Sequence, residues 1–316
     1  MKIAQYLREI GRGKEGARSL DAEQASALMA AVLDGQVGDL ELGAFVMAMR
    51  IKGESQAELG GFLQAVRERC LPLAPQRSTV VLPSYNGSRK LPNLTALLAL
   101  LLAQQEIQVL VHGPLSDPGR VTTAEIFHAL GLPVARDVED IEAGWQRQEP
   151  VFIGTQDLCP PLARLLDVRW TVGLRNSGHT IAKLLDPCSG GHSLRVVNYT
   201  HPEYGSSLNT FLQHSAADAM LLRGTEGEPV ADPRRMPRID LFIAGQPRPD
   251  LSLLAQDGVL TELPVLPRET DAATTALYIQ GVVSGEKPAP APLQQQVACL
   301  QRALAAMRMR SVAASA

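Results

Sequence analysis

The sequence predicts an α/β protein made of a small all-helical domain and a larger α/β domain, whose mainly parallel sheet is covered by helices. Two observations support this prediction. The first seventy residues are helical in pattern, whereas short apolar runs alternate with helical stretches after residue 75. Strands that alternate with helices are typical of a parallel sheet with both faces covered. The length of 316 residues is ample for a real core.

Four helices are expected before residue 75. One opens the chain at MKIAQYLREIG, and Asp21, Asp39 and Ser55 can each cap one of the three that follow. Glycines separate these segments, and Pro72 and Pro75 end the stretch. We therefore expect a small helical subdomain that ends near residue 75.

The second part of the chain carries the strand signals. Apolar runs typical of short strands begin at residues 79, 107, 151, 194, 219 and 239. Helices are expected over 93–105, 121–131 and 293–309, the last after the proline-rich stretch 287–292. Ligands of open parallel sheets bind at the carboxyl ends of the strands. The loops 83–92, 112–120, 155–161 and 223–235 are therefore the candidate binding loops.

Composition narrows the class of protein. The hydrophobic fraction of 45% and the charged fraction of 20% are typical of a soluble globular protein, and no apolar run is long enough to span a membrane. The four cysteines have no CxxC spacing and no secretory signal precedes them, so we expect reduced thiols and a cytoplasmic location. The net charge of −3 gives no whole-protein attraction for nucleic acid, and aromatic residues at 4% disfavour base stacking as the main binding device.

Basic charge is instead concentrated in the segment 164–188, RLLDVRWTVGLRNSGHTIAKLLDPC. Arg175, His179 and Lys183 are spaced at i, i+4 and i+8, so one continuous helix would place them on one exposed face. The opposite side of that helix would carry the apolar residues Leu174, Ile181, Leu184 and Leu185. Such a face can contact phosphate oxygens, although a solvated amphipathic helix is the simpler interpretation.

Several motifs together resemble one family. The succession TVVL, NLTALLALLLA, QVLVHG, VRWTVGLRNSGHTIAKLLDP and RGTEGEP is similar to the anthranilate phosphoribosyltransferase family, which has the nucleoside phosphorylase/phosphoribosyltransferase fold. The resemblance implies a cleft for phosphoribosyl diphosphate and magnesium between the two domains, and a homodimer formed through the helical domain. It also implies that the helical domain combines residues 1–75 with about 161–187, and the α/β domain residues 76–160 with 188–316.

The enzyme motifs themselves are altered. The glycine-rich GTGGD loop is matched by residues 83–87, PSYNG, and proline offers no amide hydrogen to a diphosphate. The NIST motif is matched by residues 93–96, NLTA, and Lys-His-Gly-Asn by residues 111–114, VHGP. At best Glu226 or Glu228 remains of the acidic pair, and Glu228 marks the degenerate metal position. We therefore expect no catalytic residues, no metal and no cofactor.

The segments LRNSGHTIAKLLDP, NYTHPEY and LLRGTEGEPVADPRR are similar to a non-enzymatic, YbiB-like branch of the family. This resemblance implies DNA or RNA binding without base specificity, through phosphates held in a basic groove. The expected phosphate-binding residues are Arg89, Lys90, His112, Arg169, Arg175, Asn176, His179, Lys183, Arg223, Arg234 and Arg235. The resemblance further places Cys159 and Cys188 beside the ligand site, where we expect them to lie near each other.

Two other functions stay open. A phosphoribosyl or glycosyl transferase with an altered substrate would use the retained Asn93, His112, Gly113, Arg175 and Glu228. Turnover of phosphoribosyl diphosphate with magnesium would distinguish this enzyme from a binding protein. The third function is that of a sensor for a small phosphorylated ligand.

Overall fold

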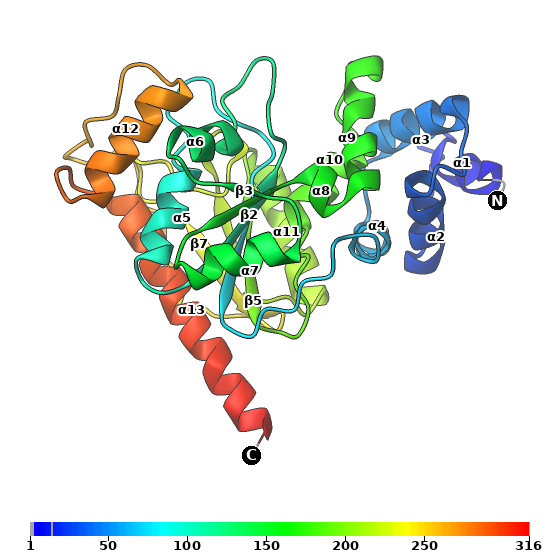
Figure 1. Cartoon of the computed structure of the whole chain (residues 1–316). Coiled ribbons are helices and arrows are strands. Elements are labelled where there is room, and N and C mark those ends of the chain that lie inside the picture. Colours follow the sequence, from blue (N-terminus) through cyan, green and yellow to red (C-terminus); the bar gives the residue numbers. More distant parts are fainter. Residues whose placement is uncertain (1–2, 14, 316) are drawn as a thin grey trace. The chain divides into compact units, whose positions relative to one another are not determined.

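The computed structural model describes residues 3–13 and 15–315, with side chains described up to residue 310 (Figure 1). The chain divides into two compact units. The helical unit comprises Met1–Leu71 and Thr155–Pro187, and the α/β unit comprises Pro72–Gly154 and Cys188–Ala316. The sequence suggested boundaries near residues 75, 161 and 187. In the structure the chain passes between the units after residues 71, 154 and 187.

The helical unit contains seven helices among the described residues. They are α1 (Ala4–Ile10), α2 (Ala22–Leu33), α3 (Asp39–Lys52), α4 (Gln56–Arg67), α8 (Thr155–Leu158), α9 (Pro160–Val172) and α10 (Ser177–Leu184). Asp21 and Ser55 cap α2 and α4 as the sequence predicts. Asp39 does not cap α3, because Gly38 occupies the N-cap position and Asp39 is the first helical residue.

The close approach of α2 and α4 is the tightest feature of this unit. A Cβ atom on Gly61 of α4 would lie 2.2 Å from the carbonyl oxygen of Ala22 and 2.9 Å from the Cβ atom of Ala25. The fully buried carboxylate of Glu58 lies in the same region and accepts hydrogen bonds from Lys52 Nζ at 2.6 Å and from the Leu20 amide at 3.0 Å. The glycine thus allows the helices to touch, and the ion pair satisfies the one charge that this contact buries.

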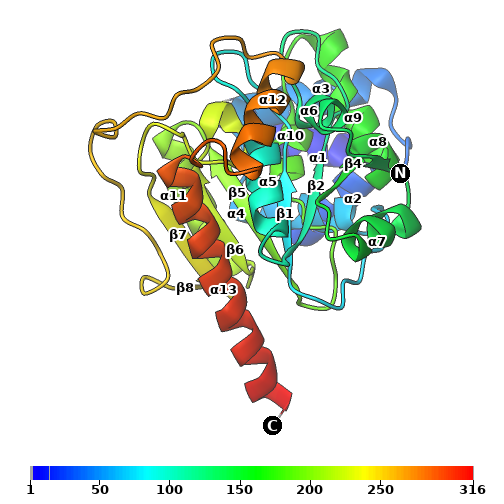
Figure 2. The same ribbon diagram turned by 60° about the vertical axis from the view of Figure 1, so that its left-hand side comes forward.

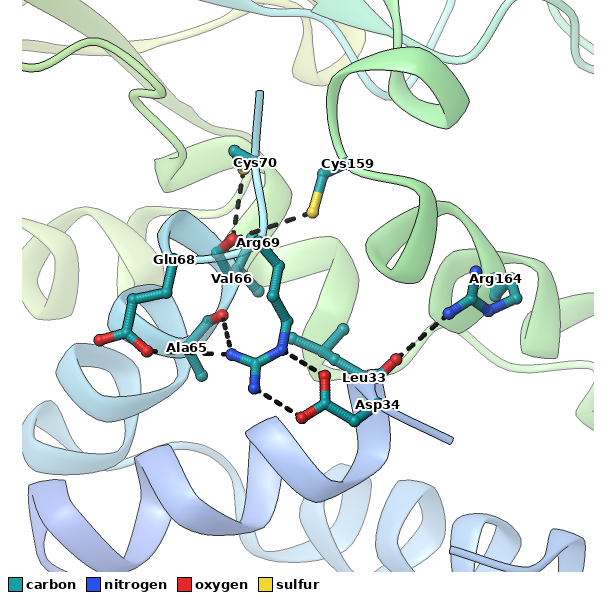
Figure 3. A network of polar contacts seen from close by, with 9 residues as sticks. All are labelled: Leu33, Asp34, Ala65, Val66, Glu68, Arg69, Cys70, Cys159 and Arg164. Carbon is teal, nitrogen blue, oxygen red and sulfur yellow. Dashed lines mark hydrogen bonds and ion pairs between the residues drawn. The ribbon is translucent and has the colours of Figure 1, made fainter. Parts of the chain in front are cut away.

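Figure 3 shows how the end of α4 is tied to its neighbours. Arg69 donates to both carboxylate oxygens of Asp34, at 2.6 and 2.7 Å, and to the carbonyl oxygen of Ala65 at 2.8 Å. Arg164 of α9 donates to the carbonyl oxygen of Leu33 at 3.2 Å. These bonds connect the carboxyl ends of α2 and α4 with α9, although the two parts of the unit are far apart in the sequence.

Two thiols meet in the same network. Cys70 and Cys159 both donate to the carbonyl oxygen of Val66, at 3.3 and 3.8 Å (Figure 3). The interaction of the two neighbouring thiols raises the pKa of Cys70 and lowers the pKa of Cys159. Cys188 belongs to the α/β unit, so its expected proximity to Cys159 stays a prediction.

The α/β unit is built on one eight-stranded sheet with the order β3-β4-β2-β1-β5-β6-β7-β8. Its strands are β1 (Thr79–Pro83), β2 (Gln108–Gly113), β3 (Val134–Ala135), β4 (Val151–Gly154), β5 (Ser193–Tyr199), β6 (Ala219–Arg223), β7 (Ile239–Ile243) and β8 (Gln246–Pro247). Pairing is parallel from β3 to β6, whereas β7 and β8 add antiparallel pairs at one edge. The predicted fold class is confirmed; β3 and β8 have two residues each and gave no sequence signal.

Helices complete the α/β unit. They are α5 (Thr95–Ala103), α6 (Thr123–Ala129), α7 (Val138–Gln146), α11 (Pro202–His214), α12 (Ala272–Val283) and α13 (Ala291–Ser315). Figure 2 shows α13 passing beside α5 and extending below the sheet. Alternate residues of the central strands, such as Val80 and Leu82, join α5, α12 and α13 in one continuous apolar core. Within the described residues, no helix combines the length and the apolar character that crossing a bilayer requires.

We predict that Gly61→Ala destabilises the helical unit by about 1–3 kcal/mol, because the added methyl group would overlap the backbone of α2. Gly60→Ala is the matched control, since nothing lies within 4 Å of a Cβ atom at that neighbouring helical position. The control should be neutral or stabilising. Urea unfolding followed by circular dichroism would compare the two; equal midpoints would contradict the proposed helix contact.

Candidate nucleic-acid interface

The loop that follows β1 lies across the end of β2. The Ser84 amide donates to the carbonyl oxygen of His112 at 2.8 Å, which continues the strand pairing by one residue. A Cβ atom on Gly113 would lie 1.8 Å from the carbonyl oxygen of Ser84. Glycine is therefore required at this position, and the loop 84–91 is held at the carboxyl edge of the sheet.

The carboxylate of Glu228 occupies the first part of this loop. One of its oxygens accepts hydrogen bonds from the amides of Asn86 and Gly87, both at 2.7 Å. The other accepts from the hydroxyl groups of Ser84 and, at 3.4 Å, Thr95. The Glu228 side chain is buried, so it acts as an anion bound inside its own protein.

Glu226 occupies the second part of the loop in the same way. It accepts from the amides of Arg89, Lys90 and Leu91, at 3.1, 2.8 and 2.9 Å. The residue lies in the short 3-10 turn η1 (Thr225–Gly227) with the left-handed backbone angles φ 51° and ψ 20°. Such a conformation is costly for a residue other than glycine, and the three amide hydrogen bonds offset that cost.

The hydrogen bonds of Glu226 and Glu228 show whether these carboxylates could bind the magnesium ion that the family implies. Both oxygens of each carboxylate already accept hydrogen bonds from backbone amides or hydroxyl groups, so the pair is not arranged as a cation site. In the part of the chain that the structure describes, no group of three or more His, Cys, Asp or Glu residues could hold a metal ion. The residues present therefore do not fit magnesium, and Glu228 serves as an internal acceptor.

The prediction that His112 binds phosphate is wrong. Its ring is fully buried, and Nδ1 lies 2.9 Å from the Tyr85 hydroxyl group. The two rings pack edge to face with centroids 5.4 Å apart. A buried ring of this kind has no surface for a nucleic-acid phosphate, so His112 positions the loop and does not bind the backbone.

The other predicted cations of the α/β unit differ among themselves. Arg89, Lys90, Arg223 and Arg235 are exposed. The prediction for Arg234 is corrected, because its guanidinium group donates to both oxygens of Asp232, at 3.0 and 2.9 Å. This ion pair compensates the charge of Arg234. Of these exposed cations, Arg89 and Lys90 belong to the loop whose amides donate to Glu226.

In the helical unit, the helix expected to carry Arg175, His179 and Lys183 contains only the last two, because α10 begins at Ser177. α9 ends at Val172, and Gly173 follows with the left-handed φ of 77°. Asn176 then caps α10, and its side chain accepts from the Gly178 amide at 2.9 Å and donates to the Leu165 carbonyl oxygen at 2.8 Å. Glycine in the left-handed region ends a helix and asparagine starts one, and these local preferences prevail over the i, i+4 spacing. Asn176 is thus a buried cap residue and no phosphate ligand.

His179 is also a correction, because only 8% of its surface is exposed. Burial, together with the positive charges of Arg175, Arg169 and Lys183, lowers the pKa of His179 to about 3. The imidazole is therefore neutral at physiological pH. Arg175 and Lys183 are half-buried; Arg175 precedes the start of α10 and Lys183 lies in its last turn, so the expected single exposed face does not form.

The structure nevertheless brings three of the predicted cations together. Arg169 comes from α9, Arg175 from the connection between helices and Lys183 from the last turn of α10, and all three act electrostatically on the one imidazole of His179. We call Arg169, Arg175 and Lys183 the cationic cluster. Positive charges that converge from three segments create a local field that favours an anion.

Two further features of this region had no clear sequence signal. The hydroxyl group of Ser177, the first residue of α10, is buried and has no hydrogen-bond partner among the described residues. The guanidinium group of Arg169 lies 4.0 Å from the ring centroid of Trp170, and 57% of the Trp170 surface is exposed. Ser177 and Trp170 both lie in the basic segment 164–188, but the spacing of charged residues did not mark either of them as a candidate.

We predict that Glu228→Ala lowers the free energy of unfolding by about 1–3 kcal/mol or more, because it leaves buried amide and hydroxyl donors without an acceptor. Glu226→Ala should cost less, since the Arg89 and Lys90 amides that it releases belong to exposed residues and can bond to water. Thermal unfolding of the two variants would measure the difference. An equal loss would argue against Glu228 as the more important internal anion.

We predict that part of the pH dependence of stability comes from His179. An unfolded histidine has a pKa of about 6.5, whereas the pKa of folded His179 is about 3. Between these values the unfolded chain binds a proton that the folded chain does not, so the free energy of unfolding falls as the pH is lowered, by at most about 1.4 kcal/mol per pH unit. His179→Gln should remove that slope and His128→Gln, at an exposed position, should keep it. Chemical unfolding at a series of pH values tests this; identical slopes in wild type and His179→Gln would refute it.

Comparisons with known proteins agree with this architecture. Residues 4–70 match the glycosyl transferase family, helical bundle domain. YbiB of Escherichia coli (strain K12) is 41% identical over 304 residues, which cover 95% of this chain and 93% of that protein. Anthranilate phosphoribosyltransferase of Symbiobacterium thermophilum is 27% identical over 226 residues, 70% of this chain and 64% of that enzyme.

Solved structures show the same fold. The crystal structure of anthranilate phosphoribosyltransferase (TrpD) from Thermus thermophilus has a TM-score of 0.70 at 21% identity and covers 96% of this chain and 93% of that chain. The Saccharomyces cerevisiae enzyme in complex with PRPP and Mg has a TM-score of 0.62 at 11% identity and covers 96% of this chain and 95% of that chain. With the helical bundle, the mainly parallel sheet and the identity to YbiB, the chain belongs to the YbiB family, on the scaffold of the anthranilate phosphoribosyltransferases.

Proposed function

We propose that this protein binds DNA or RNA through the phosphate backbone, without base specificity. The observation that carries the proposal is the convergence of Arg169, Arg175 and Lys183 around a neutral His179. Because the imidazole remains uncharged, the cluster contains three positive charges and no buried fourth one. A phosphate placed beside it would be attracted by these positive charges.

The start of α10 supports the same proposal. Amides at a helix N-terminus attract anions, and Arg175 directly precedes the Asn176 cap. A regular chain of phosphates suits such a site because contacts of this kind position the backbone and carry no sequence information.

The transferase alternative is disfavoured by the loop after β1. A diphosphate in that loop would have to displace the carboxylates of Glu226 and Glu228 from five backbone amides. Two like charges would also have to remain beside the incoming anion. The matched anthranilate phosphoribosyltransferases therefore provide the scaffold, while the binding of anions is proposed for the other unit.

A homodimer is part of the proposal. Leu40, Met47 and Ile51 are exposed and share one face of α3, with 62% of the Ile51 surface accessible. A groove of 370 Å³ lies beside this face and is lined by residues of α1 and α3, among them Leu7, Ala44, Met47 and Ile51. Exposed apolar faces of this kind are typical of contacts between subunits. Two copies would present two cationic clusters to one strand and gain from effective concentration.

The double variant Arg175→Ala/Lys183→Ala tests the nucleic-acid proposal. It should weaken binding to all sequences by considerably more than tenfold and reduce the slope of log affinity against log salt by roughly two units. The control Arg147→Ala/Arg238→Ala removes the same charge from exposed ion pairs of the α/β unit and should change affinity little. Gel-shift titrations over a salt series provide the measurement, and unchanged affinity in the first variant would refute the proposal.

Ile51→Glu tests the dimer. A carboxylate in the α3 face should convert dimers into monomers, because two charges would be buried against each other across the contact. Leu254→Glu, at a site of the α/β unit that is 81% exposed, is the control and should remain dimeric. Analytical ultracentrifugation distinguishes the two states; a monomeric wild-type protein would exclude the dimer.

A further inference from the structure

We infer that Trp170 stacks on an unpaired base, so that the preferred partner is single-stranded nucleic acid. The inference rests on the proposed function and adds to it the class of nucleic acid. It starts from the contrast between the two tryptophans of the chain. Trp145 is buried and donates its indole N–H to the Val109 carbonyl oxygen at 3.1 Å, whereas 57% of the Trp170 surface is exposed.

The position of Trp170 connects it to the cationic cluster. It lies in the last turn of α9 next to Arg169, whose guanidinium group is held 4.0 Å from the centre of the indole ring. Arg169 also belongs to the three cations that act on His179. A large aromatic surface and the proposed phosphate contacts are therefore joined through one side chain.

Charge complementarity identifies the occupant of this surface. A partner that covers the indole ring also meets the positive charge of Arg169, and a strand of nucleic acid combines a flat base with a negative phosphate in each residue. In a duplex both faces of an internal base are already stacked, so only an unpaired base can cover the ring. A single indole can take one base, which agrees with the low aromatic content and leaves the phosphates as the main contacts.

Three ligands of equal length separate stacking from charge: oligothymidine, an abasic single strand and a DNA duplex. Oligothymidine should quench the emission of Trp170, while the abasic strand and the duplex should not. Trp170→Ala should weaken oligothymidine binding by roughly 5- to 150-fold, which corresponds to about 1–3 kcal/mol for one stacked base. The affinities for the abasic strand and the duplex should remain as in the wild type.

The matched control is Trp170→Phe, which keeps an aromatic ring and should restore most of the affinity for oligothymidine. Trp145 is then the remaining tryptophan, so its buried emission provides the internal reference. Sedimentation of each variant shows whether the exchange alters the association of copies. A change of oligomeric state in Trp170→Ala would identify the ring as a subunit contact and overturn the inference.

The outcomes distinguish the two proposals. If the wild-type protein binds none of the three ligands, the nucleic-acid proposal and this inference both fail. If all three bind and Arg175→Ala/Lys183→Ala weakens them, but Trp170→Ala changes none or all of them equally, the nucleic-acid proposal stands and the stacking role is refuted. Selective loss of oligothymidine binding, restored by phenylalanine, supports it.

Discussion

The hydrogen-bond needs of one loop shape the α/β unit. Five backbone amides between residues 86 and 91 donate to Glu226 and Glu228, which belong to a turn more than a hundred residues later in the chain. The arrangement satisfies buried donors and fixes the turn after β6 against the loop after β1. The amide donors of this edge are therefore used inside the protein.

The main electrostatic feature of the helical unit is the neutral imidazole of His179. Burial and the positive charges of Arg175, Arg169 and Lys183 lower the pKa of His179, so its imidazole is neutral. A charged histidine there would add a fourth positive charge with little solvent to screen it. The neutral ring thus adds no charge to those of Arg169, Arg175 and Lys183. Arg169, through its contact with Trp170, links this charge to an exposed aromatic surface.

The sequence predicted more of the fold than of the site. The strand runs and the caps Asp21 and Ser55 have signals that are local and independent of the rest of the chain, and they agree with the structure. The expected basic face does not form, because Asn176 caps α10 and leaves Arg175 outside the helix. His112 and Arg234 were counted as phosphate contacts because their types are suitable, but burial and ion pairing are not visible in a residue type.

By itself, the sequence determined the class of fold, six of the eight strands and the segment in which basic charge is concentrated, because periodicity, caps and glycines act over a few residues. It gave no signal for α7, α11 and α12. Only the tertiary structure decided which side chains meet. It joined Glu228 to the loop after β1, gathered three cations about His179 and left Trp170 at the surface. These contacts connect residues from different segments, and their energies depend on burial and distance, which exist only once the chain has folded.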